Sequence, residues 1–190
     1  GLLLGTTGVR LKGRDILDAG LVHGFIASND VQSLLNRMRV AESPAQLLSL
    51  VDTSCVVHSD GFEHQHDADA VCGGTPYELA QNLSQSKNPF LQQAYKALMR
   101  GSPLAYHVIH AQLTSGLGRT LAEALKLEYR LVVHLLRERD FYEGVHSVLV
   151  DRDHKPNWTY QHIDDVPRDL AQTFLEKTDL PDWDPERSYQ

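Results

Sequence analysis

The sequence lacks the features that mark several protein classes. It has only two cysteines, Cys55 and Cys72, which suits a reducing compartment, and neither belongs to a CxxC or other metal-type spacing. No apolar run approaches the roughly 20 residues that a membrane span requires. No stretch carries a dense Lys/Arg cluster, and the net charge is −7. We therefore expect neither a nucleic-acid partner nor a membrane partner.

The composition that is present is that of an ordinary globular protein. Of the 190 residues, 42% are hydrophobic and 23% are charged, which is enough to bury a core in one large or two small domains. The chain opens with GLLLGTTG, an apolar run with no helix cap before it. We therefore expect the chain to be the C-terminal part of a longer protein.

Helix signals dominate the sequence. Four polar residues that can cap a helix each precede a proline, which suits a first helical turn; they are Ser43, Thr75, Asn88 and Ser102. Thr75 with Glu78, and Thr120 with Glu123, fit the capping-box spacing. Further helices are expected near residues 15–19, from Ser28 or Asn29 onward, over about 118–139 as the longest one, and over about 167–177. Strand signals are limited to 21–26 and 147–150, so we predict a mostly α fold with at most one or two short strands.

Two groups of histidines are candidates for chemistry. His58, His64 and His66 lie among four acidic residues, and His-x-His can supply two metal ligands. The spacing is only permissive, so a solvated surface segment is the favoured interpretation and we expect no metal. His107 and His110 lie one helical turn apart, and for them we favour a helix-surface or half-buried role over catalysis.

The stretch RDFYEGVHSVLVDRDHKPNW, residues 139–158, allows two interpretations. Asp140 and Glu143 lie on one side of a helical turn, as a pair of acid/base carboxylates would. Alternatively they belong to the exit of the long helix, where Gly144 permits a backbone turn. Local reasoning favours the second interpretation. No GxSxG nucleophile elbow and no GxGxxG phosphate loop occurs in the sequence.

Three segments resemble the C-terminal half of the 3-hydroxyisobutyryl-CoA hydrolases, a branch of the enoyl-CoA hydratase/isomerase (crotonase) superfamily. GLLLGTTGVRLKGRDILDAGLVHGFI is similar to the superfamily pattern GxxLxLTGxRLxGxDxxxAGxATHxV. LAEALKLEYRL is similar to LxExLxMEYRL, and residues 139–158 are similar to xDFxEGVRAxLIDKDxxPxW. The first segment indicates the superfamily only, whereas the other two favour the hydrolase branch.

The resemblance implies a CoA-thioester hydrolase of valine catabolism. Its oxyanion hole and acidic pair would lie upstream of Gly1, so no catalytic residue is expected here and this chain alone should be inactive. No cofactor is implied, the substrate is an acyl-CoA, and Arg152 and Lys155 are the candidate ligand contacts. The address would be mitochondrial in a eukaryote and otherwise cytoplasmic. Residues 1–27 would end the crotonase core, 28–179 would form a helical region with a polar insertion near 56–74, and 180–190 an irregular tail.

Departures from the pattern leave alternatives open. His146 stands where the family has Arg, Arg152 where it has Lys, Asn157 where Lys is usual, and His107 where Lys is expected. These replacements remove or soften positive charge near a substrate that carries phosphates, so they bear on substrate choice. The alternatives are a fragment of an enoyl-CoA hydratase or isomerase, and a non-catalytic helical interaction module. Self-association through an exposed truncated face is a further expectation.

Overall fold

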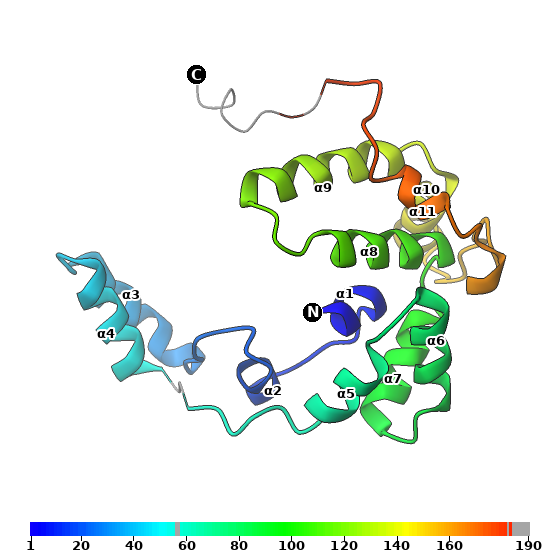
Figure 1. The fold of residues 1–190 in the computed structure, drawn as a ribbon. Coiled ribbons are helices and arrows are strands. Elements are labelled where there is room, and N and C mark those ends of the chain that lie inside the picture. The colour runs from blue at the N-terminus through cyan, green and yellow to red at the C-terminus, as the bar shows by residue number, and fades with distance from the viewer. Residues whose placement is uncertain (56–57, 182, 184–190) are drawn as a thin grey trace. The chain divides into compact units, whose positions relative to one another are not determined.

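The computed structural model describes residues 1–55, 58–181 and 183 and is built almost wholly from helices (Figure 1). The chain divides into two compact units, one of Gly1–Val9 with Ala70–Gln190, the other of Arg10–Asp69. The helices of four residues or more are α1 (Leu2–Thr7), α2 (Arg14–Asp18), α3 (Val31–Arg39), α4 (Pro44–Ser54), α5 (Gln65–Val71), α6 (Pro76–Gln85), α7 (Pro89–Leu98), α8 (Pro103–Ser115), α9 (Leu121–Leu135), α10 (Arg139–Val145) and α11 (Leu170–Thr173). Short 3-10 turns occupy η1 (Ser28–Asp30) and η3 (Ile163–Asp165), and a π-helical turn, η2 (His146–Val150), extends α10.

The predicted capping residues begin their helices as expected. The side chains of Ser43, Thr75, Asn88 and Ser102 each accept a hydrogen bond from a backbone N–H in the first turn, with proline following. Both capping boxes are complete, at the starts of α6 and α9. Each cap satisfies backbone donors that the helix itself leaves unpaired. The sequence therefore predicted these five helix starts correctly.

Helix α8 is the centre of the core of the first unit. It packs against α1, α6, α11 and η3, and its buried residues join an apolar cluster with residues of α9 and the C-terminal segment. The approach of α1 is so close that a Cβ atom at Gly5 would lie 2.6 Å from Cδ1 of Leu113. Glycine at this position therefore leaves room for the Leu113 side chain against α1, and a larger residue would force that side chain to shift.

Neither of the two predicted strands forms. Residues 21–26 contain only an isolated bridge position at Phe25, and Leu21 and Val22 are exposed. Residues 147–150 belong instead to the π-helical turn, which is closed by a hydrogen bond from the Asp151 N–H to the His146 carbonyl. An apolar run becomes a strand only where a neighbouring strand can pair with it, and the described residues contain no such strand.

Several helix boundaries also differ from the prediction. The longest helix ends at Leu135, rather than continuing to Arg139, and a separate helix starts at Arg139. The break is stabilised because the Tyr142 hydroxyl donates to the Leu136 carbonyl across 2.9 Å. The helix predicted over 167–177 is confined to α11. Part of the predicted polar insertion near 56–74 forms the regular helix α5.

The other unit, Arg10–Asp69, contains the pair α3 and α4 and a polar link near α2. The expected cap at Ser28 or Asn29 is absent, because both residues lie in the η1 turn and the described N-cap of α3, Asp30, makes no side-chain capping bond. The Arg14 guanidinium donates to Asp60 across 2.8 Å. Asp18 accepts from the Ser59 hydroxyl across 2.8 Å, and this hydrogen bond is the main reason that the pKa of Asp18 is lowered.

The predicted division at residues 27 and 179 stays a prediction. In the predicted tail, residues 182 and 184–190 lie outside the described residues. Within the part of the chain that the structure describes, no helix combines the length and apolar character needed to cross a membrane.

Candidate functional site

Asp140, in the first turn of helix α10, joins three separate segments. Only 7% of Asp140 is exposed. One carboxylate oxygen accepts from the Ser102 hydroxyl at 2.5 Å, and the other accepts from the Thr159 N–H at 2.8 Å. Ser102 also caps α8 by accepting from the Ala105 N–H. The buried carboxylate therefore connects the start of α10, the start of α8 and the segment that follows η2.

The remaining contacts of α10 hold the same following segment. The Glu143 carboxylate accepts from the Asn157 N–H at 2.7 Å, and the Arg139 guanidinium donates to the Asn157 carbonyl at 2.9 Å. A Cβ atom added to Gly144 would lie 3.1 Å from Cη2 of Trp158. Gly144 therefore matters for the close approach of the Trp158 ring rather than for a turn, since it lies inside the helix. These five residues, with Asp140, Ser102 and Thr159, form what we call the framework.

This geometry decides between the two interpretations of Asp140 and Glu143. Both carboxylates accept hydrogen bonds from the polypeptide backbone 14 and 19 residues further along the chain. Asp140 is buried, so water and a substrate have little access to it. These contacts support the predicted packing role and not an acid/base pair, but the pair lies in the separate helix α10, which begins at Arg139, rather than at the exit of the long helix.

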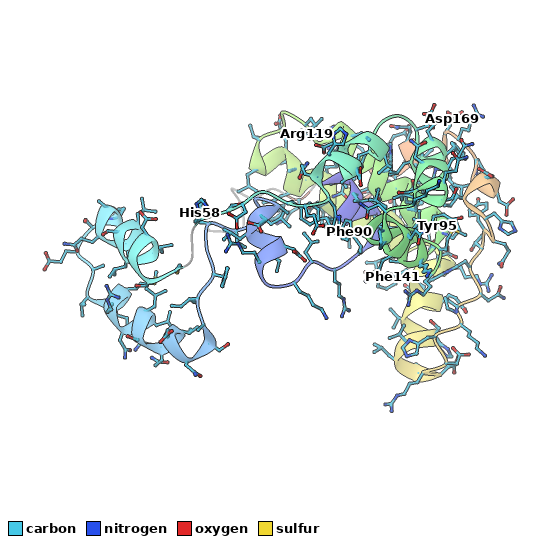
Figure 2. The ribbon with its side chains drawn as sticks, turned by 90° about the horizontal axis from the view of Figure 1, so that it is seen from below. His58, Phe90, Tyr95, Arg119, Phe141 and Asp169 are labelled. Carbon is cyan, nitrogen blue, oxygen red and sulfur yellow. The ribbon has the colours of Figure 1, made fainter. Side chains whose placement is uncertain are left out.

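The outer side of the same helix is apolar. Phe141, Val145 and Val148 follow one another at helical spacing and are each more than two-fifths exposed, and Leu149 is 66% exposed. Figure 2 shows the yellow helix of residues 139–150 extending away from the green helices of its unit. We call these four side chains the outer ridge. Four exposed apolar side chains on one short segment form an apolar surface of the kind that marks a place of interaction.

The two predicted ligand contacts, Arg152 and Lys155, lie in the turn directly after the outer ridge. Arg152 has φ 58° and His154 has φ 55°, a left-handed conformation that side chains other than glycine adopt infrequently. The Lys155 N–H donates to Asp153, and the His146 ring lies 2.9 Å from Asp151. Arg152 and Lys155 are exposed, and neither forms an ion pair with a described residue. Both cations are therefore available to bind an anionic group.

The sequence of this whole region, from α1 to the end of α11, matches a known family. The family model described as Enoyl-CoA hydratase/isomerase matches residues 1–175. The chain belongs to this family. Its fold agrees, because it matches an enoyl-CoA hydratase structure from Rhodobacter sphaeroides with a TM-score of 0.73 and 27% identity over 92% of this chain and 50% of that one. A carnitinyl-CoA dehydratase from Mycobacterium thermoresistibile has the same fold, with a TM-score of 0.77, 17% identity, and coverage of 95% of this chain and 52% of that one.

Curated relatives within the family are mitochondrial 3-hydroxyisobutyryl-CoA hydrolases. The rat protein is 32% identical over 87% of this chain and 46% of its own length. The zebrafish (Danio rerio) protein is 33% identical over 83% of this chain and 44% of its own length, and the Dictyostelium discoideum protein is 28% identical over 92% and 48%. This family member therefore spans about half the length of the curated relatives that it matches. The predicted resemblance is confirmed.

The two histidines of α8 are buried in this family member, which differs from the helix-surface alternative. His107 is 2% exposed, and its Nε2 atom lies 3.0 Å from the Ile163 carbonyl oxygen. His110 is 7% exposed. Burial is the main cause that lowers the pKa of both imidazoles. The rings of Tyr77 in α6 and Tyr106 in α8 contact the His107 ring.

The other sequence candidates do not form a site in the described residues. His58 lies 3.2 Å from Asp60, and His64 contacts the ring of Phe62. No group of three or more His, Cys, Asp or Glu side chains in residues 1–55, 58–181 and 183 is arranged to hold a metal ion. Cys55 and Cys72 are half-buried and are not joined by a disulfide.

Sequence reasoning missed two contributors to the framework. It treated Ser102 only as a helix cap, although the same hydroxyl donates to Asp140, 38 residues away. It treated Trp158 only as part of a family pattern, although its ring covers Gly144. The Ser-Pro and the Asn-Trp pairs were visible in the sequence, but only the folded chain shows which carboxylate and which glycine they meet.

Proposed function

We propose that this chain is the C-terminal portion of a 3-hydroxyisobutyryl-CoA hydrolase-like enzyme. In that reaction water adds to the thioester carbonyl carbon, the carbon–sulfur bond breaks, and free CoA and the hydroxy acid are released. The proposal is supported by the curated relatives, which are 3-hydroxyisobutyryl-CoA hydrolases and match at 28–33% identity over most of this chain. In a eukaryote this enzyme would be mitochondrial, as those relatives are, and would serve valine breakdown.

The structural observation that carries the proposal is the exposed apolar ridge of the segment 139–155, which two exposed cations follow. The inner framework fixes the helix, the outer ridge presents apolar side chains, and Arg152 and Lys155 follow within a few residues of Leu149. An acyl-CoA combines an apolar acyl and pantetheine chain with phosphate groups, so it offers a complementary pattern. We infer that the outer ridge borders the acyl-CoA site and that the two cations approach its phosphates.

We expect this chain to bind the acyl-CoA and to shape its site, and not to supply the catalytic groups. In this proposal the oxyanion donors and the acidic pair come from sequence that precedes Gly1. We identify no accessible cluster of described residues that brings together a nucleophile, a general base and oxyanion-hole donors. Asp140, the buried carboxylate of the framework, accepts a hydrogen bond from the backbone. The isolated chain should therefore not hydrolyse the thioester.

One further candidate, a hydratase or isomerase, is favoured by the likeness to the solved enoyl-CoA hydratase. The hydrolase and hydratase proposals are distinguished by comparing two substrates. The assay uses a protein in which this chain follows an N-terminal half of the same family. The hydrolase releases a thiol from 3-hydroxyisobutyryl-CoA, which a thiol reagent detects. The hydratase adds water across crotonyl-CoA without releasing a thiol, which is followed by loss of enoyl absorbance. Thiol release without hydration supports the proposal, and hydration without thiol release overturns it.

A further inference from the structure

Helix α8 holds two buried imidazoles that the proposed acyl-CoA surface does not use. His107 and His110 lie one helical turn apart. The Nε2 atom of His107 is bonded to the Ile163 carbonyl, whereas Nε2 of His110 is buried and has no hydrogen-bond partner among the described residues. A neutral imidazole can leave this atom as an unprotonated acceptor at modest cost. A protonated imidazole would bury a charged N–H with nothing to accept it, which is far less favourable.

The segment that His107 contacts, residues 162–168, is here called the strap. Its Val166 carbonyl accepts a hydrogen bond from the Tyr77 hydroxyl at 3.0 Å, and the Arg168 guanidinium lies 5.6 Å from the centre of the Tyr77 ring. The Tyr77 ring also contacts His107, with the two ring centres 5.0 Å apart. Tyr77 and His107 together therefore hold the strap against α6 and α8.

The strap also forms one wall of a cleft. A cavity of about 510 Å³ is lined by residues of α6 and α7 and by the strap residues His162, Ile163 and Asp164. Tyr77 lines this cavity too, and a second one of about 480 Å³ lies along Asp164 to Arg168. The strap therefore lines two hollows, and any movement of it would change both.

We propose that His107 and His110 form an acid-sensitive latch, in which the neutral pair holds the strap closed and protonation of the pair releases it and opens the cleft. The two imidazoles are close enough to repel each other when both are charged. Release exposes them to water, which removes the penalty of the buried charge. The apolar contacts of Val166 oppose release, and this opposition keeps the strap closed at neutral pH.

The charged and titratable groups around the pair agree with this direction. Burial lowers the pKa of His107 most strongly; its bond to Ile163 and the charge of Asp164 on the strap raise it in part, and His110 lowers it further. Burial also lowers the pKa of His110, and a hydrogen bond with the Gly74 backbone opposes that change. The rings of Tyr77 and Tyr106 contact His107, and burial raises the pKa of Tyr106. Helices α1 and α11 contribute no titratable side chain.

The sign of the effect follows from these shifts. Both folded-state pKa values lie below the ordinary histidine value of 6.5, so the open state binds protons more readily than the closed state. The latch is therefore fully effective above about pH 6.5, and it weakens as the pH falls through the lowered values.

Hydrogen exchange of the strap amides tests the latch in the 190-residue chain. After correction for intrinsic rates, the protection of residues 163–166 should fall at least about tenfold between about pH 7.5 and about pH 5, while α7 keeps its protection. His110→Leu removes the unpaired nitrogen and should leave less than about half of that change. His107→Gln keeps a donor for the Ile163 carbonyl and should also reduce it. His23→Gln, at an exposed position, should behave as the wild type.

Three results would overturn the latch. The first is a strap that stays protected from hydrogen exchange at acid pH, and the second is a loss of protection in the strap and α7 together. The third is a loss of strap protection that is as large in His110→Leu and His107→Gln as in the wild type. If His110→Leu does not fold, the titrations of His107 and His110 in the wild-type chain, monitored by NMR, test the latch instead. Titration midpoints of His107 and His110 that coincide with loss of strap protection support the latch, and titration while the strap stays protected contradicts it.

Discussion

The Ser102 hydroxyl donates to the Asp140 carboxylate at 2.5 Å, and this bond joins the first turn of α8 to the first turn of α10. The same hydroxyl accepts from the Ala105 N–H, so one side chain both starts a helix and holds a second helix against it. The position of the outer ridge depends on this contact, because α10 makes its inner contacts through a few polar side chains rather than through an apolar face.

Removing either partner of this bond should destabilise the chain strongly. Asp140→Asn weakens a buried, charge-assisted acceptor and Ser102→Ala removes its donor, and each should lower the free energy of unfolding by about 2–3 kcal/mol. The double variant should lose less than the sum, with a coupling of about 1 kcal/mol. Urea unfolding measures all three. Asp169→Asn, at an exposed position, is the control and should change little; additive losses at 102 and 140 would contradict the contact.

The close approach of Trp158 to Gly144 predicts an unusual effect of alanine. In an open helix Gly→Ala stabilises by about 1 kcal/mol. At Gly144 the new methyl group would lie 3.1 Å from the indole, so the ring must shift, and we expect net destabilisation of about 1–2 kcal/mol. Trp158 emission should move to longer wavelength as the ring becomes more exposed. Gly73→Ala meets no atom within 4 Å and serves as the control. A stabilised Gly144→Ala variant would show that the ring does not pack there.

The capping box of α6 predicts a pH-dependent contribution. The Glu78 carboxylate accepts from the Thr75 N–H at 2.7 Å and from its hydroxyl at 2.9 Å, and these bonds hold the pKa of Glu78 below its usual 4.5. Its contribution is therefore present above about pH 4.5 and is lost as the pH falls through the lowered value.

Glu78→Gln should unfold at a lower urea concentration than the wild type at about pH 7, and the two curves should converge at about pH 3. Glu128→Gln, on the exposed side of α9, should match the wild type at both values. A difference between wild type and Glu78→Gln that persists unchanged at acid pH would mean that the ionised capping box is not its source.

The two cations after the outer ridge predict a defect in substrate binding. In the protein that carries this chain with its upstream half, Arg152→Ala with Lys155→Ala should raise KM for the acyl-CoA by about tenfold, or ~1.4 kcal/mol, with a smaller effect on kcat. The difference should shrink as salt is added, because these contacts are exposed. Lys87→Ala is the matched control. An unchanged KM would remove both residues from the acyl-CoA site.

The sequence predicted those parts of the structure that local chemistry determines. The residues Ser43, Thr75, Asn88, Ser102 and Thr120 start helices because their side chains satisfy donors within the next three residues. Local reasoning about residues 139–158 also correctly favoured packing over an acid/base role for Asp140 and Glu143. Both inferences use information that lies within a short window of sequence.

The errors come from contacts that no short window contains. A strand is predicted over residues 147–150 from their apolar character, but this short run contains no information on whether a partner strand exists. The end of α9 was placed too late because the apolar stripe continues to Leu136, while the turn there is stabilised by Tyr142. The burial of His107 depends on Ile163, which lies 56 residues away. Such partners follow from the fold alone.

The central claim is that this chain shapes the acyl-CoA site of a hydrolase whose chemistry lies in preceding sequence. The most direct measurement is thiol release from 3-hydroxyisobutyryl-CoA by the 190-residue chain and by the longer protein that contains it, at equal concentration. The account predicts release by the longer protein and none above background by the chain alone. Hydrolysis by the chain alone, or its absence from a well-folded longer protein, would contradict it.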